Sequence, residues 1–469
     1  MTRAAGGIWR RDPRRQLHLS LGLLGVLSSL GYLSVTVRLG SQPVFLRWGF
    51  PQGDFLSFFL LHFVPLFLLM LAGAWWTFRA GADDAGTLGV ILGFGLLFRL
   101  LLLPVPPVLS SDIYRYIWDA RMQASGVNPY LARPADRPPA DPQRDPIYQQ
   151  QNRPFARTIY PPLAQFSFRA SRVLGGEGVT AMKGVMVLGD LFTLGLLLLL
   201  LPGLSLPRSR VLLYAWHPLA VFEVAGSGHV DALAVPCILL AVLAWRRDRN
   251  LAAGVCLGAA TLVKIYPILL LPVLLGRRRR PLLLGCVAAI LVGYLPFLPG
   301  AGLGVLGHLP RFLADPEETF NPSLMGVAEF LLSRASSSGV SLASWFGRIA
   351  LLGILLWLLR RRSDHPTDLV PGIWLVAAAA TLLTPTLHPW YLLWLLPFLA
   401  IDPRPEWIYL SGAIALSYLF YLVTPWSRAL LGTVEYLPFL VMLFLRWRAH
   451  PHAPGLSLSH SPRRGRADG

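Results

Sequence analysis

The feature that most constrains this chain is its series of long apolar blocks. Uncharged hydrophobic segments of about 15 to 23 residues recur between polar breaks, and such lengths cross a hydrocarbon core of roughly 30 Å as helices. The alternating pattern of membrane β-barrel strands is not visible. Only 14% of the 469 residues are charged and the mean hydropathy is +0.53, which excludes an ordinary soluble domain. The sequence therefore predicts an all-α integral membrane protein.

Several blocks are too short to cross a membrane alone, so we expect some helices to be broken and buried among their neighbours. We expect about 11 to 14 crossings in total. The predicted spans are Leu17 to Val37, Phe55 to Trp76, Leu88 to Leu103, Met182 to Leu201, Val211 to Ala225, Val230 to Trp245, Leu251 to Leu262, Ile268 to Leu275, Leu282 to Leu295, Trp345 to Leu359, Val370 to Leu387, Trp390 to Ala400, Ile408 to Val423 and Glu435 to Leu445.

The formal net charge of +18 comes largely from arginines grouped at the ends of predicted spans. Basic groups of this kind stay on the cytoplasmic side, so both termini are predicted to be cytoplasmic. Because spans separate the groups, they form no continuous basic stripe, and a nucleic-acid partner is excluded. The groups are Arg10 to Arg15, Arg246 to Arg249, Arg277 to Arg280, Arg360 to Arg362 and Arg446 to Arg466.

This topology predicts one polytopic domain, residues 17–447, in the cytoplasmic membrane. A basic cytoplasmic N-terminus (1–16) and a disordered basic cytoplasmic tail (448–469) would flank it. Counting from the arginine groups puts residues 104–160 and 300–344 on the extracytoplasmic face. These are the only long polar stretches, so we expect chemistry or ligand binding there.

The first loop opens with a pattern typical of an amphipathic helix. Ser110 and Ser111 are suited to cap a helix that starts at Asp112. At helical spacing its polar face carries Asp112, Arg115, Tyr116 and Asp119, which we expect to lie at the membrane surface, presented to whatever sits above. The helix N-terminus favours an ionised Asp112, suited to accept a proton.

Each acidic residue of this helix also has a purely structural interpretation. Asp112 could simply complete the helix N-terminus, which is a common use of aspartate. Asp119 lies four residues after Arg115, and an ion pair between the two would explain it equally well.

Lys264 is a charge between two apolar runs, where it is costly without a task. Pro267 breaks the helix and predicts that Lys264 and Tyr266 stand at the apex of an external hairpin. The competing interpretation is that Lys264 extends to the membrane interface.

Two histidine motifs are also predicted at the external ends of spans. Gly226-Ser227-Gly228-His229-Val230-Asp231 could let His229 and Asp231 bind a ligand, or could be a turn in which they lock two helix ends together. His388, before Pro389-Trp390-Tyr391, could contact phosphate, or the motif could anchor the chain at the interface.

Taken in order, these strings resemble a known family. The further matches are Gly126-Val127-Asn128-Pro129-Tyr130, Tyr160-Pro161-Pro162, Trp216-His217-Pro218 and Leu262-Val263-Lys264-Ile265-Tyr266-Pro267. The chain resembles the prokaryotic polyprenyl-phosphate-mannose-dependent mannosyltransferases, such as glycosyltransferase family 87, within the GT-C superfamily.

The resemblance implies a GT-C-type bundle whose two long extracytoplasmic loops bear short amphipathic helices. It also implies inverting transfer of a hexose from a polyprenyl-phosphate sugar to a glycan or glycolipid acceptor, and mannose is the expected hexose. Asp112 matches the catalytic aspartate of the first external loop. The chain lacks the tight Asp-x-Asp pair, and three predicted spans precede the loop where the family pattern has one.

In such a transfer one base suffices, because a phosphate leaving group needs little protonation. We expect Asp112 to be that base, with Arg115 and Lys264 near the donor phosphate. No ligand spacing indicates a metal, although a divalent ion is compatible with this chemistry. The remaining candidates for donor binding are Tyr160, Asp119, Tyr266, His229, Asp231 and His388.

The alternative from another class is a transporter or flippase of lipid-linked saccharides. Such a protein also needs many spans and buried cations. It should show related halves with matching broken helices, and no internal repeat is visible in this sequence. The sequence therefore favours the enzyme.

Overall fold

The computed structural model describes residues 13–40, 53–276, 279–314, 320–321, 323–335, 339–361, 366–422 and 424–449. Within these ranges all regular secondary structure is helical, apart from one isolated bridge between Phe320 and Thr386. The predicted all-α fold is therefore confirmed. Most of the two predicted basic ends, residues 1–12 and 450–469, lie outside the described residues.

Seven helices in the described part of the chain are long and apolar enough to cross a membrane. A helix rises about 1.5 Å per residue, so about 20 apolar residues span the hydrocarbon core. The chain is a multi-pass membrane protein. The seven helices are α1 (Pro13–Gly40), α2 (Gly53–Ala80), α3 (Ala85–Leu102), α7 (Val179–Gly203), α13 (Arg279–Tyr294), α16 (Gly339–Arg361) and α20 (Pro425–Ala449).

The other predicted spans are shorter or interrupted helices, and the expected breaks are present. Proline lacks a backbone N–H and is tolerated at the start of a helix, and Pro218, Pro267 and Pro389 each stand near the start of a short segment. These segments are η3 (Arg208–Val211), α8 (Leu212–Ala215), α9 (Pro218–Ala220), the π-helical turn η4 (Val221–Gly226), α10 (Asp231–Arg246), α11 (Asn250–Val263), η5 (Tyr266–Leu270), α12 (Leu271–Leu274), η8 (Pro366–Asp368), α17 (Leu369–Leu383), η9 (Pro389–Leu392), α18 (Leu396–Ile401), α19 (Pro405–Ala413) and η10 (Ile414–Tyr421).

The two long loops contain only short elements. The first holds α4 (Asp112–Ala124) and then mostly irregular, proline-rich chain, and α6 follows it directly. The remaining elements are η2 (Pro134–Asp136), α5 (Pro146–Gln149), α6 (Pro162–Gly175), η6 (Leu295–Phe297), η7 (Gly302–Leu306), α14 (Leu309–Ala314) and α15 (Leu324–Ala335).

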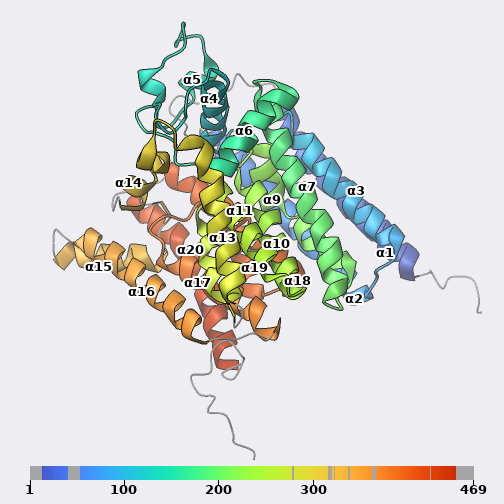
Figure 1. Cartoon of the computed structure of the whole chain (residues 1–469). Helices are drawn as coiled ribbons and strands as arrows, with labels where there is room; N and C mark the ends of the chain where they lie inside the picture. Colours follow the sequence, from blue (N-terminus) through green and yellow to red (C-terminus); the bar gives the residue numbers. More distant parts are fainter. Residues whose placement is uncertain are drawn as a thin grey trace, which may run out of the picture.

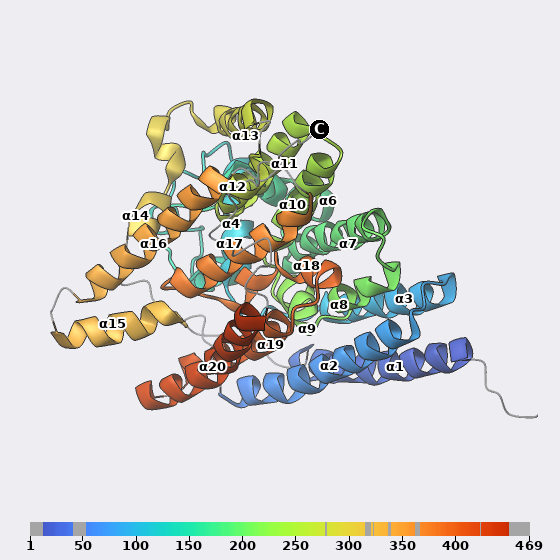
Figure 2. The same cartoon turned by 90° about the horizontal axis from the view of Figure 1, so that it is seen from below.

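The first loop and the start of the second lie at the same end of the bundle. Figure 1 shows α4, α5, α6 and α14 gathered there, while α1 begins and α20 ends at the opposite end. The loops touch each other: His308 N donates to Thr158 O at 3.0 Å, and Asn128 Nδ2 donates to Phe297 O at 2.8 Å. Further along the second loop, α15 packs on α16, and this pair projects from the side of the bundle (Figures 1 and 2).

Buried charges fix the helix that leads into the first loop. The Arg99 guanidinium of α3 pairs with Asp190 of α7 and donates to Ala215 O at 2.7 Å, and all of these atoms lie in the interior. Lys183 Nζ donates to Leu102 O at 2.9 Å and to Val105 O at 2.6 Å, so it satisfies carbonyls at the end of α3. Because charges inside a membrane protein are costly unless paired, these contacts set where α3 ends and the loop begins.

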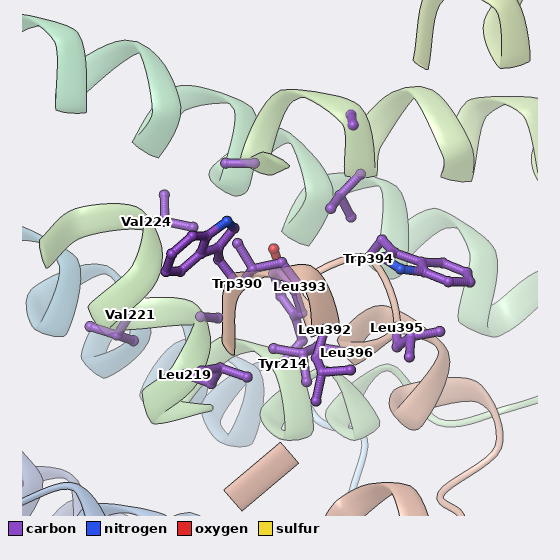
Figure 3. Close-up of a cluster of buried hydrophobic side chains, with 14 of the residues drawn as sticks. Tyr214, Leu219, Val221, Val224, Trp390, Leu392, Leu393, Trp394, Leu395 and Leu396 are labelled. Carbon is purple, nitrogen blue, oxygen red and sulfur yellow. The ribbon is translucent and has the colours of Figure 1, made fainter. Parts of the chain in front are cut away.

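The core beneath this end is built from the interrupted helices. Figure 3 shows Trp390 beside Val224 of η4, with the leucines that follow Trp390 gathered near Tyr214 of α8. α18 packs on α8, and η9 packs on α9. Segments more than 150 residues apart in the sequence thus meet directly under the first loop.

Candidate active site

Asp112 is the first residue of α4, as the sequence predicted. Ser111 is the N-cap, although its side chain makes no capping hydrogen bond, and Ser110 Oγ accepts from Asp112 N at 3.3 Å. The Asp112 side chain is 20% exposed, and Asn152 Nδ2 donates to Asp112 Oδ1 at 3.3 Å. The carboxylate therefore stands at the N-terminal end of the helix dipole, which favours negative charge, with part of its surface accessible.

The expectation that the polar face of α4 is open is wrong. Residues Ile113 to Ala120 are all buried, because the rest of the first loop and α6 cover the helix. Arg115 Nε pairs with Asp119 Oδ1 at 2.8 Å, and Asp119 Oδ2 accepts from Thr158 at 2.7 Å. Gln165 of α6 also donates to Oδ2, at 2.8 Å. The predicted i+4 pair exists, and it is engaged in holding the loop together.

His229 lies between two carboxylates. Its Nδ1 is 4.0 Å from Asp112 Oδ2, and its Nε2 is 3.3 Å from Glu223 Oε2. The His229 side chain is 1% exposed. Gly228, with φ +76°, turns the chain from η4 toward α10 and brings His229 under α4. The Gly226-Ser227-Gly228 motif is thus a turn that places His229 close to Asp112.

Lys264 and Tyr266 stand where the sequence predicted, at the break between α11 and η5. Lys264 Nζ is 2.9 Å from Asp231 Oδ2, in the first turn of α10, and 5.3 Å from the centre of the Tyr391 ring. The Tyr266 side chain lies beside the same Asp231. Asp231 is fully buried and Lys264 is 14% exposed, so the cation of this pair is the accessible member.

His388 belongs to a continuous stack of four rings. His229 stacks on Trp390 with centroids 4.0 Å apart, Trp390 stacks on His388 at 4.3 Å, and His388 stacks on Phe320 at 4.4 Å. Burial, together with the charges of His229, Lys264 and Arg153, lowers the pKa of His388 to about 3. His388 is therefore neutral at physiological pH, and it would meet a phosphate as a hydrogen-bonding group.

Two tyrosines close the space beside Asp112. The Tyr116 and Tyr160 rings meet edge to face with centroids 4.8 Å apart. Burial is the main cause that raises the pKa of both hydroxyls well above the usual range, and the charge of the Asp112 carboxylate adds to it. Both hydroxyls therefore stay protonated. Asp231 acts on the Tyr116 hydroxyl as well, which connects Asp112 and the Lys264 pair within one cluster.

Four residues of this cluster were missed as site candidates from the sequence: Glu223, Asn152, Arg153 and Trp390. Glu223 had a readable signal, since it is a lone acid inside an apolar span. Asn152 and Arg153 had none, because they lie in an irregular, proline-rich stretch. Trp390 was interpreted as an interfacial anchor, but it is 6% exposed and its ring lies between two histidines.

Several buried polar atoms of this region have no hydrogen-bond partner among the described residues. They include the side-chain amide of Gln151, His388 Nδ1 and Trp390 Nε1. Buried polar groups are normally hydrogen-bonded, so these atoms suit a hydroxyl-rich ligand. No group of three or more histidines, cysteines and acidic residues in the described ranges is arranged to hold a metal ion.

A helical membrane bundle that gathers ionisable side chains under a long first loop is the architecture of a GT-C membrane glycosyltransferase. Residues 20–277 match the family model described as alpha-(1->6)-mannopyranosyltransferase, N-terminal domain. This match covers more than half of the chain, and the chain belongs to that family. Neither the curated proteins nor the solved structures compared with it gave a match.

The family assignment confirms the predicted class of activity: the protein is a mannosyltransferase. It decides against the transporter or flippase that the sequence had left as the alternative. The matched range contains Asp112, His229, Asp231 and Lys264, whereas His388 lies beyond it.

Proposed function

We propose that this mannosyltransferase takes mannose from a polyprenyl-phosphate carrier and passes it to a hydroxyl of a glycan or glycolipid, with Asp112 as the general base. The observation that carries the proposal is the cluster itself. Asp112 is a partly exposed carboxylate, and Lys264 is a partly exposed cation whose partner Asp231 faces the same Tyr116 hydroxyl as Asp112. A base and a phosphate-binding cation are the two groups that such a transfer needs.

The reaction follows from these positions. The acceptor oxygen attacks the anomeric carbon from the face opposite the phosphate, and the anomeric configuration is inverted. Asp112 takes the proton of the attacking hydroxyl as the new carbon–oxygen bond forms. The bond to the phosphate oxygen breaks, and its electron pair leaves with the lipid phosphate, which needs little protonation.

Lys264 and Arg153 are suited to stabilise the departing phosphate. The Lys264 ammonium has three donors, and Asp231 occupies one of them. Arg153 is exposed in the first loop, and its charge acts on His388, as does that of Lys264. Of the earlier candidates, Arg115 is engaged with Asp119 and Ala156 O, so we assign it to positioning of the loop.

We place this chemistry on the extracytoplasmic face of the cytoplasmic membrane. The arginine groups at the end of the bundle opposite α4, such as Arg246 to Arg249, support this orientation. A lipid-linked donor in the outer leaflet then reaches the end of the bundle that carries the first loop.

The decisive test is Asp112→Asn in proteoliposomes supplied with labelled polyprenyl-phosphate mannose and a mannoside acceptor. Loss of the base should lower the transfer rate by about 100-fold or more. Thermal unfolding and donor binding should be unchanged, because the amide keeps the shape of the carboxylate.

The matched control is Asp141→Asn, which removes an exposed carboxylate from the same loop and should leave transfer intact. Normal transfer by the Asp112 variant would rule out Asp112 as the base. Equal transfer from nucleotide-linked mannose would rule out the polyprenyl-phosphate donor.

A further inference from the structure

The residue that the reaction above leaves unexplained is Glu223. Its side chain is 1% exposed, in the middle of an apolar segment, where an acid is costly without a task. Tyr418 donates to Glu223 Oε1 at 2.6 Å. In the described part of the chain its ion-pair partner is His229, whose Nε2 is 3.3 Å from Oε2.

Two contacts, one of the backbone and one of the side chains, join Glu223 and His229. The backbone N–H of His229 donates to the carbonyl oxygen of Glu223 at 2.9 Å, while their side chains face each other. Gly228, with φ +76°, makes this possible, because it folds the chain back over the end of the π-helical segment η4. π-helical segments are frequent at functional sites.

The His229 ring is fixed from the side as well. It stacks on Trp390 with an angle of 14° between the ring planes, so it is held in one plane. There Nε2 lies 3.3 Å from Glu223 Oε2, and Nδ1 lies 4.0 Å from Asp112 Oδ2. Acid–base contacts are often long before a substrate binds, and a small movement of the partly exposed Asp112 closes this gap.

We propose that Glu223 is a positioning residue that makes His229 the proton acceptor for Asp112. The inference rests on the proposed function of Asp112. The Glu223 carboxylate, 3.3 Å from Nε2, favours the tautomer with the proton on Nε2, which leaves the lone pair of Nδ1 on the side of Asp112. An acidic residue that orients a histidine in this way is the logic of the serine hydrolase triad.

The proton transfer balances without another reactant. The acceptor hydroxyl gives its proton to Asp112 as the glycosidic bond forms and the phosphate leaves with the bonding electron pair. The proton then moves from Asp112 to Nδ1 of His229, and Glu223 stabilises the imidazolium. Asp112 is restored as a carboxylate, and the imidazolium returns the proton to water when the product leaves.

The charges around His229 favour this route. Asp112 faces it from α4 and Glu223 from η4, and the neutral His388 lies beyond Trp390 in the stack. The other charges of the cluster, Asp231 and Lys264, pair with each other. The imidazolium would therefore form between two negatively charged carboxylates.

The test is Glu223→Gln in the full chain, reconstituted in proteoliposomes. We expect kcat to fall by about 10- to 100-fold with an unchanged KM for the donor. The acid limb of the kcat profile should also move to lower pH. Without the carboxylate the imidazolium is less stable, so more acid is needed to protonate the ring and block it as an acceptor. A merely structural role would lower kcat without moving the limb.

A double-mutant cycle with His229→Asn completes the test. If Glu223 acts through His229, Glu223→Gln should cause no further loss of kcat in the His229→Asn background. Independent losses would overturn the inference. Glu406→Gln, which alters a buried acid of α19 that faces Arg446 in the last turn of α20, is the control and should leave the pH profile unchanged.

Asp112→Asn separates this inference from the proposed function. An inactive Asp112 variant beside a fully active Glu223→Gln overturns only the role of Glu223, whereas full activity in both overturns the two together. Should Glu223→Gln fail to fold, Tyr418→Phe carries the test, because it removes the hydrogen bond on Oε1. A several-fold lower kcat supports the inference, and an unchanged kcat overturns it.

Discussion

At the scale of single residues, burial separates the two carboxylates of α4. Asp112 is partly exposed and has one weak hydrogen bond from Asn152. Asp119 is fully buried, and its oxygens are engaged with Arg115, Thr158 and Gln165. The same residue type on one helix thus has two environments: Asp119 holds the loop together, and the accessible Asp112 suits the proposed role of general base.

We predict that Asp119→Asn destabilises the protein and spares the chemistry. The substitution leaves the buried Arg115 without its counter-ion, which costs about 3 kcal/mol of unfolding free energy. A thermal-shift assay in detergent should show a lower midpoint, while folded variant protein keeps kcat within a few-fold of wild type. A stable Asp119→Asn protein without transfer would instead place Asp119 in the donor site.

Local rules predicted part of this site. Two serines before Asp112 predicted the start of α4, although the Ser111 side chain does not cap it, and the four-residue spacing predicted the Arg115–Asp119 pair. The approach of Asp112 to His229 and Glu223 could not be predicted, because Asp112 lies more than 100 positions from both and meets them only through tertiary packing. The covering of α4 was missed for the same reason, since an irregular loop carries no periodic signal.

At the scale of elements, the turn between η4 and α10 sets the position of Asp112. Gly228 has φ +76°, and a Cβ there would lie 2.6 Å from Ile113 Cδ1 and 2.9 Å from Lys183 Cγ. Glycine is therefore needed for the backbone conformation and for the close approach of the first turn of α4.

Gly228→Ala should reduce transfer far more than stability. The left-handed backbone costs a side chain about 1 to 2 kcal/mol, and the clash with Ile113 pushes the first turn of α4 away from His229. A displacement of about 1 Å in a catalytic group can lower kcat by about 100-fold. Steady-state kinetics with the lipid donor, beside a thermal-shift assay, would measure both effects.

Gly226→Ala is the matched control, two residues earlier in the same motif. Its nearest neighbours would lie 3.8 Å from the new Cβ, which is ordinary van der Waals contact. We expect transfer close to wild type. Equal losses in the two variants would show that the turn needs flexibility in general, and that the contact with Ile113 is not the cause.

At the scale of the whole molecule, the apolar blocks predicted the helical membrane bundle, and Pro267 predicted the break between α11 and η5. That the two long loops share one face followed from the spacing of spans and arginine groups, since an even number of predicted crossings lies between them. The spacing of the spans did not predict which part of the second loop contacts the first loop and which part packs elsewhere. α15 packs on α16 at the side of the bundle because its apolar residues need a helical partner.

The orientation of this bundle in the membrane is the assumption that links the site to its donor, and single cysteines test it directly. In a background with Cys237, Cys256 and Cys286 replaced by alanine, Asp141→Cys marks the exposed tip of the first loop. We expect a membrane-impermeant maleimide to label it in intact cells, because the proposed orientation places α4 and its loop outside. Arg247→Cys, exposed at the opposite end, should react only after permeabilisation. The reverse pattern would put Asp112 in the cytoplasm, out of reach of a donor in the outer leaflet.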